Sequence, residues 1–392
     1  MNYVLFDDKT RENLLPLTFT RPTAELRFGI LSIREKWGKH LNKKLSYLTE
    51  DYLGEKYSTQ IESENILING SVCPSPELVS AISNLDPDEA LIAGPTIIAC
   101  HLDKDGVRAF DGQNTTNFQS VEYKSEVLKI DQLWDLFQKN GDAIEQDFEL
   151  ITNGRNSASI SDTNKVLGEN LFVEEGVSME HVIINSTMGP VYIGANVEIM
   201  EGSMIRGPFA ICNDSTIKLG TKIYGPTTIG PHSKVGGEIS NSIIMGYSNK
   251  AHDGFMGNSL VGEWCNIGAG TNTSNLKNNY SEVKIWSYSS NSFESTGLQF
   301  CGLIMGDHSK CSINTMFNTG TVVGVNANIF GTGFPPKQIP SFSWGGPDEM
   351  ETFDFDKAVE LVKLVMKRRN IEFGASEEKI LREIYNRTLT NH

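Results

Sequence analysis

The chain has 392 residues, which is enough for two or three domains with cores of their own. Hydrophobic residues make up 39% and charged residues 21% of it, a balance typical of globular proteins and not of disordered or membrane-spanning chains. The 34 basic and 49 acidic residues give a net charge of -15, which repels nucleic acids and anionic membranes. We therefore expect neither a nucleic acid nor a membrane as a partner.

The six cysteines indicate a reducing compartment. They form no CxxC pair and no zinc spacing, and they are too sparse for a secreted disulfide scaffold. The opening residues, MNYVLFDDKT, lack the basic n-region of a secretory signal peptide. We expect a cytoplasmic location.

The first part of the chain alternates short apolar runs with helical stretches. The apolar runs cover residues 3–6, 45–49, 66–69 and 91–99, and the helical stretches cover residues 24–37, 76–85 and 131–141. Such alternation predicts an α/β layer domain, which we place at residues 1–152. Residues 153–164, rich in Ser, Asn and Asp, are predicted to be a linker.

The middle of the chain repeats with a period of six residues. Eight successive sixth positions are aliphatic: Ile193, Ile199, Ile205, Ile211, Ile217, Ile223, Ile229 and Val235. Neither a helix nor a single long strand has this period, whereas a short strand followed by a tight corner does. The same phase continues, with slips, at Leu171, Val177, Ile183, Val261, Ile267, Met305, Cys311, Phe317, Val323 and Ile329. We expect a parallel β-solenoid over residues 165–335, with a β-sandwich of coincidental spacing as the weaker alternative.

The last part, residues 336–392, begins with a segment rich in Pro and Gly. It continues into two amphipathic helices, predicted over residues 356–370 and 376–387, with Ser376 as the N-cap of the second. Such a helical tail is suited to cap the open end of a solenoid.

These residues resemble a known family. The repeat resembles the left-handed β-helix of hexapeptide acyltransferases, and the order of the parts resembles the bifunctional N-acetylglucosamine-1-phosphate uridyltransferase/glucosamine-1-phosphate acetyltransferase family, in a shortened variant. The resemblance rests on Lys250-Ala251-His252, Phe255-Met256-Gly257, the stretch from Cys265 to Thr271 with the letters CNIGAGT, and Ser274-Asn275. It implies an α/β nucleotidyltransferase-like N-terminal domain, a left-handed parallel β-helix of hexapeptide repeats and a helical C-terminal tail.

The resemblance also implies roles for residues of the solenoid. His252 would be the general base that deprotonates an attacking amine, and Glu238 would orient its ring. Asn266 and Asn275 match substrate-contacting residues of the family. Acetyl-CoA would be the cosubstrate, with Lys310 and Lys337 as candidates for its phosphates. The alternative for His252 is a hydrogen-bonded loop histidine without chemistry, and the alternative for the two lysines is a solvated surface position.

The chain departs from the family at four substrate-binding positions, where Ile211, Ser240, Phe255 and Leu276 replace an Arg, a Lys and two Tyr. Each change removes a hydrogen-bond donor for phosphate or sugar hydroxyls. The residues that we expect to compensate are Lys222, Lys250, Lys277 and Tyr280. The acceptor therefore need not be glucosamine-1-phosphate itself.

The histidines do not predict a metal site. His181, His232, His252 and His308 lie far apart in the sequence and include no H-x₄-H pair. We expect no metal in the solenoid.

The first domain resembles the nucleotidyltransferase part of the family less closely. Thr10 and Arg11 follow the first strand as in the family, and Arg21 adds a further cation for a nucleotide or sugar phosphate. However, no glycine precedes Gly29, and Ser71 stands where the family has a magnesium-binding Asp. Mg²⁺ is expected only if nucleotidyl transfer is retained. A degenerate sugar-phosphate-binding or oligomerising domain remains the alternative.

The sequence thus predicts an acetyl-CoA-dependent acyltransferase acting on an amino sugar or an amino-sugar phosphate, in nucleotide-sugar and cell-envelope biosynthesis. The alternatives are a sugar-1-phosphate nucleotidyltransferase (uridylyl- or thymidylyltransferase) whose β-helix serves assembly, and a non-catalytic scaffold. The partners would be a small-molecule sugar phosphate and coenzyme A. The resemblance further implies a homotrimer with the acyl site between neighbouring solenoids.

Overall fold

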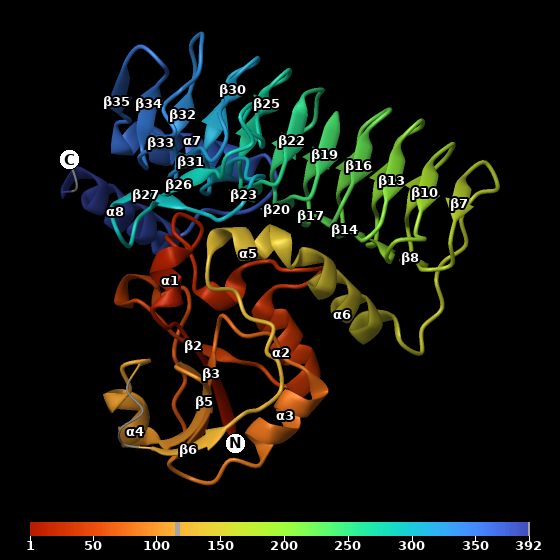
Figure 1. The fold of residues 1–392 in the computed structure, drawn as a ribbon. Coiled ribbons are helices and arrows are strands. Elements are labelled where there is room, and N and C mark those ends of the chain that lie inside the picture. The colour runs from red at the N-terminus through yellow and green to blue at the C-terminus, as the bar shows by residue number, and fades with distance from the viewer. Residues whose placement is uncertain (114–117, 391–392) are drawn as a thin grey trace. The chain divides into compact units, whose positions relative to one another are not determined.

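The computed structural model describes residues 1–113 and 118–390, which form two compact units (Figure 1). The first unit comprises Met1–Leu14, Thr20–Leu26 and Leu31–Gln132. The second comprises Leu15–Phe19, Arg27–Ile30 and the rest of the chain from Leu133. The domain ranges 1–152, 165–335 and 336–392 that we expect from the sequence stay a prediction, since this division is coarser.

The first unit is built on a six-stranded sheet with the strand order β2-β1-β3-β5-β4-β6. Its strands are β1 (Asn2–Phe6), β2 (Ser46–Leu48), β3 (Glu64–Asn69), β4 (Glu89–Ala93), β5 (Thr96–Asp103) and β6 (Gln119–Glu122). Strand β1 pairs in parallel with both β2 and β3, so the carboxyl ends of these three strands meet at one edge of the sheet. Its helices are α1 (Thr10–Asn13), α2 (Ile33–Leu41), α3 (Pro76–Ser83) and α4 (Lys104–Ala109), with single 3₁₀ turns at Thr23–Glu25 and Asp51–Leu53.

Three sequence predictions for residues 24–141 need correction. The apolar run 91–99 is not one strand, because the chain reverses at Gly94, whose φ of +55° suits glycine, and β4 and β5 pair antiparallel. Within 24–37 only the end is helical: α2 begins after Ser32, whose side chain accepts a hydrogen bond from Glu35 N. The predicted helix 131–141 is two helices, α5 (Leu133–Gln138) and α6 (Asn140–Thr152).

The chain between the 3₁₀ turn Thr23–Glu25 and α2 is not helical, because backbone N–H groups of Arg27–Ile30 donate to side chains of α6 instead of to a helix of their own. Gly29 N donates to Asn140 Oδ1 at 2.9 Å, and Ile30 N donates to Asp147 Oδ2 at 2.8 Å. Gly29 has a φ of +83°, and a Cβ at this position would lie 2.6 Å from the carbonyl oxygen of Ala143. Segment Arg27–Ile30 is therefore fixed against α6 by contacts that lie more than 100 residues away in the sequence.

The second unit contains a parallel β-solenoid whose coils stack into three long sheets (Figure 1). The first sheet consists of β7 (Lys165–Leu167), β10 (Ile183–Asn185), β13 (Met204–Arg206), β16 (Lys222–Tyr224), β19 (Glu238–Ser240) and β22 (Phe255–Gly257). The second consists of β8 (Leu171–Val173), β11 (Val191–Ile193), β14 (Phe209–Ile211), β17 (Thr227–Ile229), β20 (Ile243–Gly246), β23 (Leu260–Glu263), β28 (Ile304–Met305), β31 (Val322–Val323) and β33 (Gln338–Ile339). The third consists of β9 (Ser178–Met179), β12 (Glu198–Ile199), β15 (Thr216–Ile217), β18 (Lys234–Val235), β21 (Asn249–Lys250), β24 (Asn266–Ile267), β29 (Lys310–Cys311), β32 (Asn328–Ile329) and β34 (Ser343–Gly345), with β35 (Met350–Thr352) antiparallel at its end.

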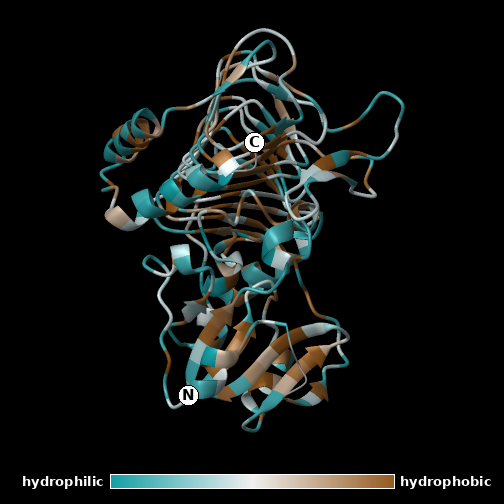
Figure 2. Ribbon diagram, turned by 90° about the vertical axis from the view of Figure 1, so that its left-hand side faces the viewer, coloured by the Kyte–Doolittle hydropathy of each residue, from teal (hydrophilic) through white to brown (hydrophobic). Residues whose placement is uncertain are grey.

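The predicted six-residue repeat is the core of this solenoid. Ile193, Ile211 and Ile229 lie in register on neighbouring strands and are fully buried. Burial of each such side chain contributes about 1.5–3 kcal/mol. Figure 2 shows the hydrophobic residues along the stacked coils and along the sheet strands of the first unit. The fold prediction is confirmed: a nucleotidyltransferase-like α/β part, then a parallel β-helix of hexapeptide repeats, then a helical tail.

The solenoid also carries an inserted hairpin and a stack of aromatic rings. Strand β25 (Asn272–Thr273) pairs with β30 (Met316–Phe317), and the chain between them forms the hairpin of β26 (Lys284–Ser287) and β27 (Ser292–Ser295). At one corner, rings of successive coils stack in the order His232, Tyr247, Trp264 and His308, with centroid distances of 4.7, 4.3 and 6.3 Å.

The tail contains helices α7 (Phe355–Lys367) and α8 (Ala375–Thr390). Phe342, on the last coil, contacts the rings of Phe355 and Tyr385 at 5.9 and 5.1 Å, so both helices cap that end of the solenoid. The prediction that Ser376 is the N-cap of the second helix is wrong, because α8 begins one residue earlier. Within the described ranges, no helix combines the length and the apolarity needed to cross a bilayer.

Candidate functional site

The turn that contains His252 lies at a corner of the solenoid, between β21 and β22. His252 and Asp253 are exposed, whereas Lys250 before them is buried. Glycines on both sides allow the coils to approach this turn closely: a Cβ at Gly236 would lie 2.6 Å from Ala251 O, and a Cβ at Gly254 only 2.0 Å from Thr271 O. The turn is therefore clamped between its neighbouring coils, while the imidazole faces solvent.

Glu238 lies at the same corner, one coil earlier. Its N–H donates to Gly254 O, and it stands in register with Phe255, three residues after His252. Its carboxylate accepts a hydrogen bond from Tyr224 Oη at 2.7 Å, which raises the pKa of the Tyr224 hydroxyl, and it lies 3.7 Å from Lys222 Nζ. Among the described contacts, none joins the carboxylate to the His252 ring. The sequence did not predict Tyr224 as a partner of this carboxylate.

Four asparagines lie on the coil of the turn and on the next coil: Asn272 lies against the residue that follows the turn, whereas Asn258 and Asn275 lie beyond the far end of β22. Asn266 is exposed on β24, in register with Asn249 and Lys310. Asn275 Nδ2 donates to Asn258 Oδ1 at 2.8 Å, and Asn272 Oδ1 accepts from Phe255 N at 2.8 Å. Asn266 and Asn275 thus lie on the coil after the turn, but no described contact joins either of them to it. The structure also adds Asn258 and Asn272, whose only signal in the sequence is their place beside the expected motifs.

Lys250, which the sequence predicts to bind substrate, has a buried ammonium. Only 3% of the residue is exposed, and Nζ donates to the carbonyl oxygen of His252 at 2.7 Å. Burial lowers the pKa of this ammonium to about 8, against the opposing effect of the nearby Asp253 carboxylate. Its donor is directed at the turn and not at solvent.

The two lysines expected to bind coenzyme A are also engaged. Lys310 Nζ donates to His308 O at 2.6 Å, and burial lowers its pKa to about 8. Lys337 Nζ donates to Lys284 O at 3.0 Å and lies 5.8 Å from the ring of Phe293. Burial, with the nearby Lys277, lowers the pKa of Lys337.

Lys277 and Tyr280 belong to the insertion that carries the β26–β27 hairpin. Lys277 Nζ donates to Ser281 Oγ at 3.4 Å and to Glu282 O, while Tyr280 is 64% exposed. A cavity of about 490 Å³ adjoins this hairpin, lined by Phe19, Trp286, Tyr288, Gln338 and Arg387 among others. Neither Lys277 nor Tyr280 lines it, and among the contacts of the described residues none joins either of them to the His252 turn.

In the first unit, polar residues gather where β1, β2 and β3 end. Asp7 is buried, lies 3.4 Å from Arg11 Nε and accepts a hydrogen bond from Thr49 Oγ1 at 2.5 Å. Burial raises the pKa of Asp7, whereas the Arg11 cation lowers it. Arg11 Nη2 donates to Tyr52 Oη at 2.8 Å, and Arg21 is 5% exposed.

Asp8 and Thr10 complete this sheet edge. Asp8 accepts from Thr10 N at 2.9 Å and from Asn69 Nδ2 at 2.8 Å. Lys129 Nζ lies 4.0 Å from Asp8 and donates to Thr10 Oγ1 at 2.9 Å. The carboxyl ends of strands in an open α/β sheet are where such folds bind ligands.

The residues at this edge do not fit the Mg²⁺ of a nucleotidyltransferase. Ser71, where the family has an Asp, donates its hydroxyl to Asn69 Oδ1 at 2.6 Å. The carboxylates of Asp7 and Asp8 already accept hydrogen bonds from protein donors. The Lys129 ammonium lies beside Asp8, so Mg²⁺ would have to compete with it for this carboxylate. Over the described residues, no group of three or more His, Cys, Asp or Glu is arranged to hold a metal.

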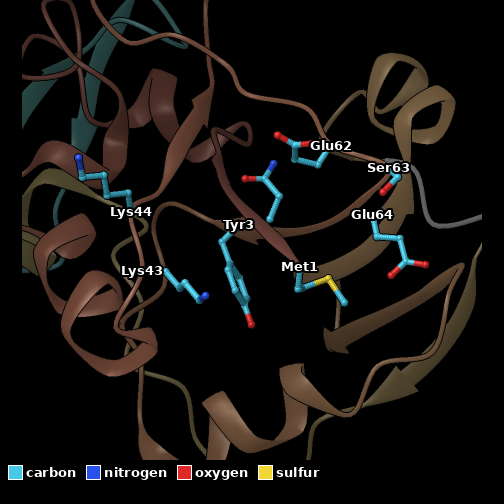
Figure 3. A pocket seen from close by; sticks show the side chains of 8 residues that line it. Met1, Tyr3, Lys43, Lys44, Glu62, Ser63 and Glu64 are labelled. Carbon is cyan, nitrogen blue, oxygen red and sulfur yellow. The ribbon is translucent and has the colours of Figure 1, made fainter.

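A second cavity, of about 450 Å³, belongs to the first unit and lies at the amino end of β1, opposite the carboxyl edge. In Figure 3 the side chains of Lys43 and Lys44 and those of Glu62 and Glu64 surround Tyr3. Because it is not at the carboxyl edge, it is not the expected place for a nucleotide. No pattern in the sequence predicts this cavity.

The buried pair of Asp7 and Arg11 predicts a large effect on stability. Arg11→Met is expected to lower the free energy of unfolding by about 3–5 kcal/mol, because it leaves the Asp7 carboxylate buried without its cation. The double variant Arg11→Met/Asp7→Asn should recover part of this loss, since no unpaired charge remains. Urea unfolding of the three chains measures both effects, and equal stabilities of the two variants would contradict the pairing.

Comparison with known proteins supports the same family. Residues 3–156 match a family model described as sugar nucleotidyl transferase. The chain is 32% identical over 123 residues to the bifunctional protein GlmU of Methanocaldococcus jannaschii, covering 31% of this chain and 27% of that protein. It is 27% identical over 213 residues to the bifunctional sugar-1-phosphate nucleotidylyltransferase/acetyltransferase of Sulfurisphaera tokodaii, covering 54% and 46%.

A third relative, the bifunctional protein GlmU of Synechococcus elongatus, is 25% identical over 236 residues, covering 56% of this chain and 48% of that protein. The chain therefore spans less than half the length of these three relatives. Among solved structures, the polysialic-acid-specific acetyltransferase NeuO aligns with 55% of this chain and 90% of its own at 15% identity, with a TM-score of 0.25, which carries no conclusion. The resemblance to the bifunctional family is confirmed, and the matches support an enzyme of the transferase class.

Proposed function

We propose that the chain is an acetyl-CoA-dependent acyltransferase that acetylates the amine of an amino sugar or an amino-sugar phosphate, with His252 as the general base. The observation that carries this proposal is the His252 turn: an exposed imidazole on a turn that is clamped between coils, with Asn272 of the next coil bonded to the backbone of Phe255. The relatives that combine nucleotidyl transfer with acetyl transfer support the same reaction class.

The imidazole provides the proton transfer that the reaction needs. An ammonium cannot attack a thioester, and imidazole is the side chain that accepts a proton near neutral pH. The His252 ring would take a proton from the amine while the amine nitrogen attacks the thioester carbonyl. The tetrahedral intermediate then collapses, the C–S bond breaks, and the proton passes from His252 to the departing thiolate of coenzyme A. The reaction is balanced by a new amide and a free thiol.

The remaining predicted residues have supporting roles in this proposal. Asn266 and Asn275 would contact the sugar, and the exposed Tyr280 would contact a hydroxyl. Lys310, Lys337 and Lys277 would contact phosphates after rearrangement of their present hydrogen bonds. Glu238, which contacts Tyr224 and Lys222, would place a negative charge near the imidazolium. To orient the His252 ring by a hydrogen bond, its carboxylate would first have to release Tyr224 or Lys222. The homotrimer and the cytoplasmic location stay predictions from the resemblance and the sequence.

Nucleotidyl transfer in the first unit is the second candidate function. The observations that favour it are the family model over residues 3–156 and the position of Thr10 and Arg11 at the carboxyl edge of the sheet. The same edge offers Mg²⁺ no free carboxylate, so we derive no metal-dependent step. We propose that this edge binds a sugar phosphate or a nucleotide.

A paired assay of the whole chain separates the two functions. Free thiol release from acetyl-CoA is measured across a panel of amino sugars and their 1-phosphates, beside pyrophosphate release from nucleoside triphosphates with sugar 1-phosphates. We expect thiol release that requires an amino sugar. Pyrophosphate release without any thiol release would favour nucleotidyl transfer over acyl transfer. The absence of both products would contradict both proposed functions.

A further inference from the structure

Lys250 occupies a position that neighbouring coils of the solenoid fill with apolar side chains. It stands in register with Val235, which in turn stands in register with Ile217. On the coils that follow, the same inward column is filled by Ile267, Cys311 and Ile329. A lysine at this place has to bury its ammonium among apolar neighbours, which is costly unless the charge is hydrogen-bonded.

The hydrogen bond that the ammonium forms is directed at the candidate site. Nζ donates to His252 O at 2.7 Å, so the side chain spans the inside of the corner and holds the backbone of the residue whose ring we propose to be the base. Gly236 and Gly254 bring the neighbouring coils against the same turn. The turn is therefore fixed by its neighbouring coils and, from within the solenoid, by Lys250.

We propose that Lys250 is a positioning residue: its buried side chain fixes the His252 carbonyl, and through it the direction in which the imidazole leaves the turn. This inference rests on the proposed function of His252. A direct role in substrate binding does not fit, because only 3% of the residue is exposed and its donor is directed at the backbone. A role in stability alone does not fit either, because an apolar residue of similar length fills such a column without the cost of burying a charge.

Lys250→Met tests the proposal, because methionine keeps most of the volume and removes the donor. Lys250→Gln keeps an N–H donor, and Ile217→Met is the matched control for a packing change in the same column. Three readouts are compared: thermal unfolding, kcat and KM for acyl transfer, and the histidine ring signals in NMR spectra, with the His252 signal assigned from His252→Asn.

We expect Lys250→Met to unfold at the same or a higher temperature, to lose about 100-fold in kcat with KM for the thioester nearly unchanged, and to show a displaced His252 signal. Lys250→Gln should recover part of kcat, and Ile217→Met should resemble the unsubstituted chain. An unchanged kcat and an unchanged His252 signal in Lys250→Met would overturn the proposal. A raised KM with an unchanged His252 signal would also overturn it, in favour of ligand binding.

The NMR readout separates this proposal from that of the general base. If His252 proves dispensable for acyl transfer, the proposed function fails, while a displaced ring signal in Lys250→Met still supports the positioning of the turn. If neither Lys250 variant folds, the unsubstituted chain is labelled at lysine nitrogen and histidine carbonyl carbon. A through-bond coupling between Lys250 Nζ and the His252 carbonyl is then expected, and its absence would overturn the proposal.

Discussion

His252→Ala is expected to lower the rate of acyl transfer by about 10²–10⁴-fold, the range typical for removal of a general base. The imidazole is exposed, and its backbone is held by Lys250 and by the neighbouring coils, so loss of the ring removes little packing. The thermal unfolding temperature should therefore stay within a degree or two of the unsubstituted chain. Thiol release from acetyl-CoA at saturating amino sugar measures the rate.

The control for this variant is His181→Ala. His181 is also an exposed histidine of the solenoid, with a left-handed φ of +54°, but it lies several coils away from the site. Its replacement should leave the rate unchanged. A rate in His252→Ala equal to that of the control would remove His252 from the mechanism and leave the solenoid without a proposed base.

Gly254→Ala is expected to reduce both stability and acyl transfer. The added methyl group would lie 2.0 Å from the carbonyl oxygen of Thr271, and the φ of +122° at Gly254 is one that L residues rarely adopt. The turn can accept the side chain only if it separates from the next coil, which moves His252. We expect a loss of several kcal/mol in the free energy of unfolding, on the order of 2–4, and about a 100-fold loss of rate.

Gly220→Ala is the control for a glycine with positive φ that has no close neighbour. Gly220 also has a left-handed φ, of +64°, but a Cβ there meets no atom within 4 Å. Its replacement should cost only about 1 kcal/mol and leave the rate unchanged. Equal losses in the two variants would mean that the contact with Thr271 adds nothing to the cost, and the clamped turn would lose its support.

The solenoid could be predicted from the sequence because its core depends on local spacing. Ile217 and Val235 pair at a separation of 18 residues, which equals three six-residue steps, so the inward positions can be counted along the chain. Val235 and Lys250 pair at a separation of only 15 residues, and this shorter coil breaks the count. The turn with His252 could therefore be identified from the sequence, but Lys250 was predicted to bind substrate. Its inward direction depends on the pairing with Val235, which the six-residue period does not give.

The chain before the solenoid was harder to predict because its irregular segments depend on distant contacts. Residues 24–37 have a helical pattern, yet Gly29 and Ile30 donate their N–H groups to Asn140 and Asp147. The contacts of Glu238 could not be predicted for the same reason, because Tyr224 and Lys222 lie near it only when one coil stacks on the next. Side-chain pairing across coils or between distant segments leaves no local signal in the sequence.

The short stretch Arg27–Ile30 limits how this chain can be divided in the laboratory. A fragment that ends at Gln132 would keep the stretch but lose Asn140, Asp147 and the Met245 carbonyl that accepts from Arg27 Nε. A fragment that starts at Leu133 would keep those acceptors and lose their donors, leaving Thr228 without the Gly29 carbonyl. No single cut yields two intact halves, so truncations made to separate the two chemistries would damage the very part they aim to preserve, and point substitutions are the sounder tool.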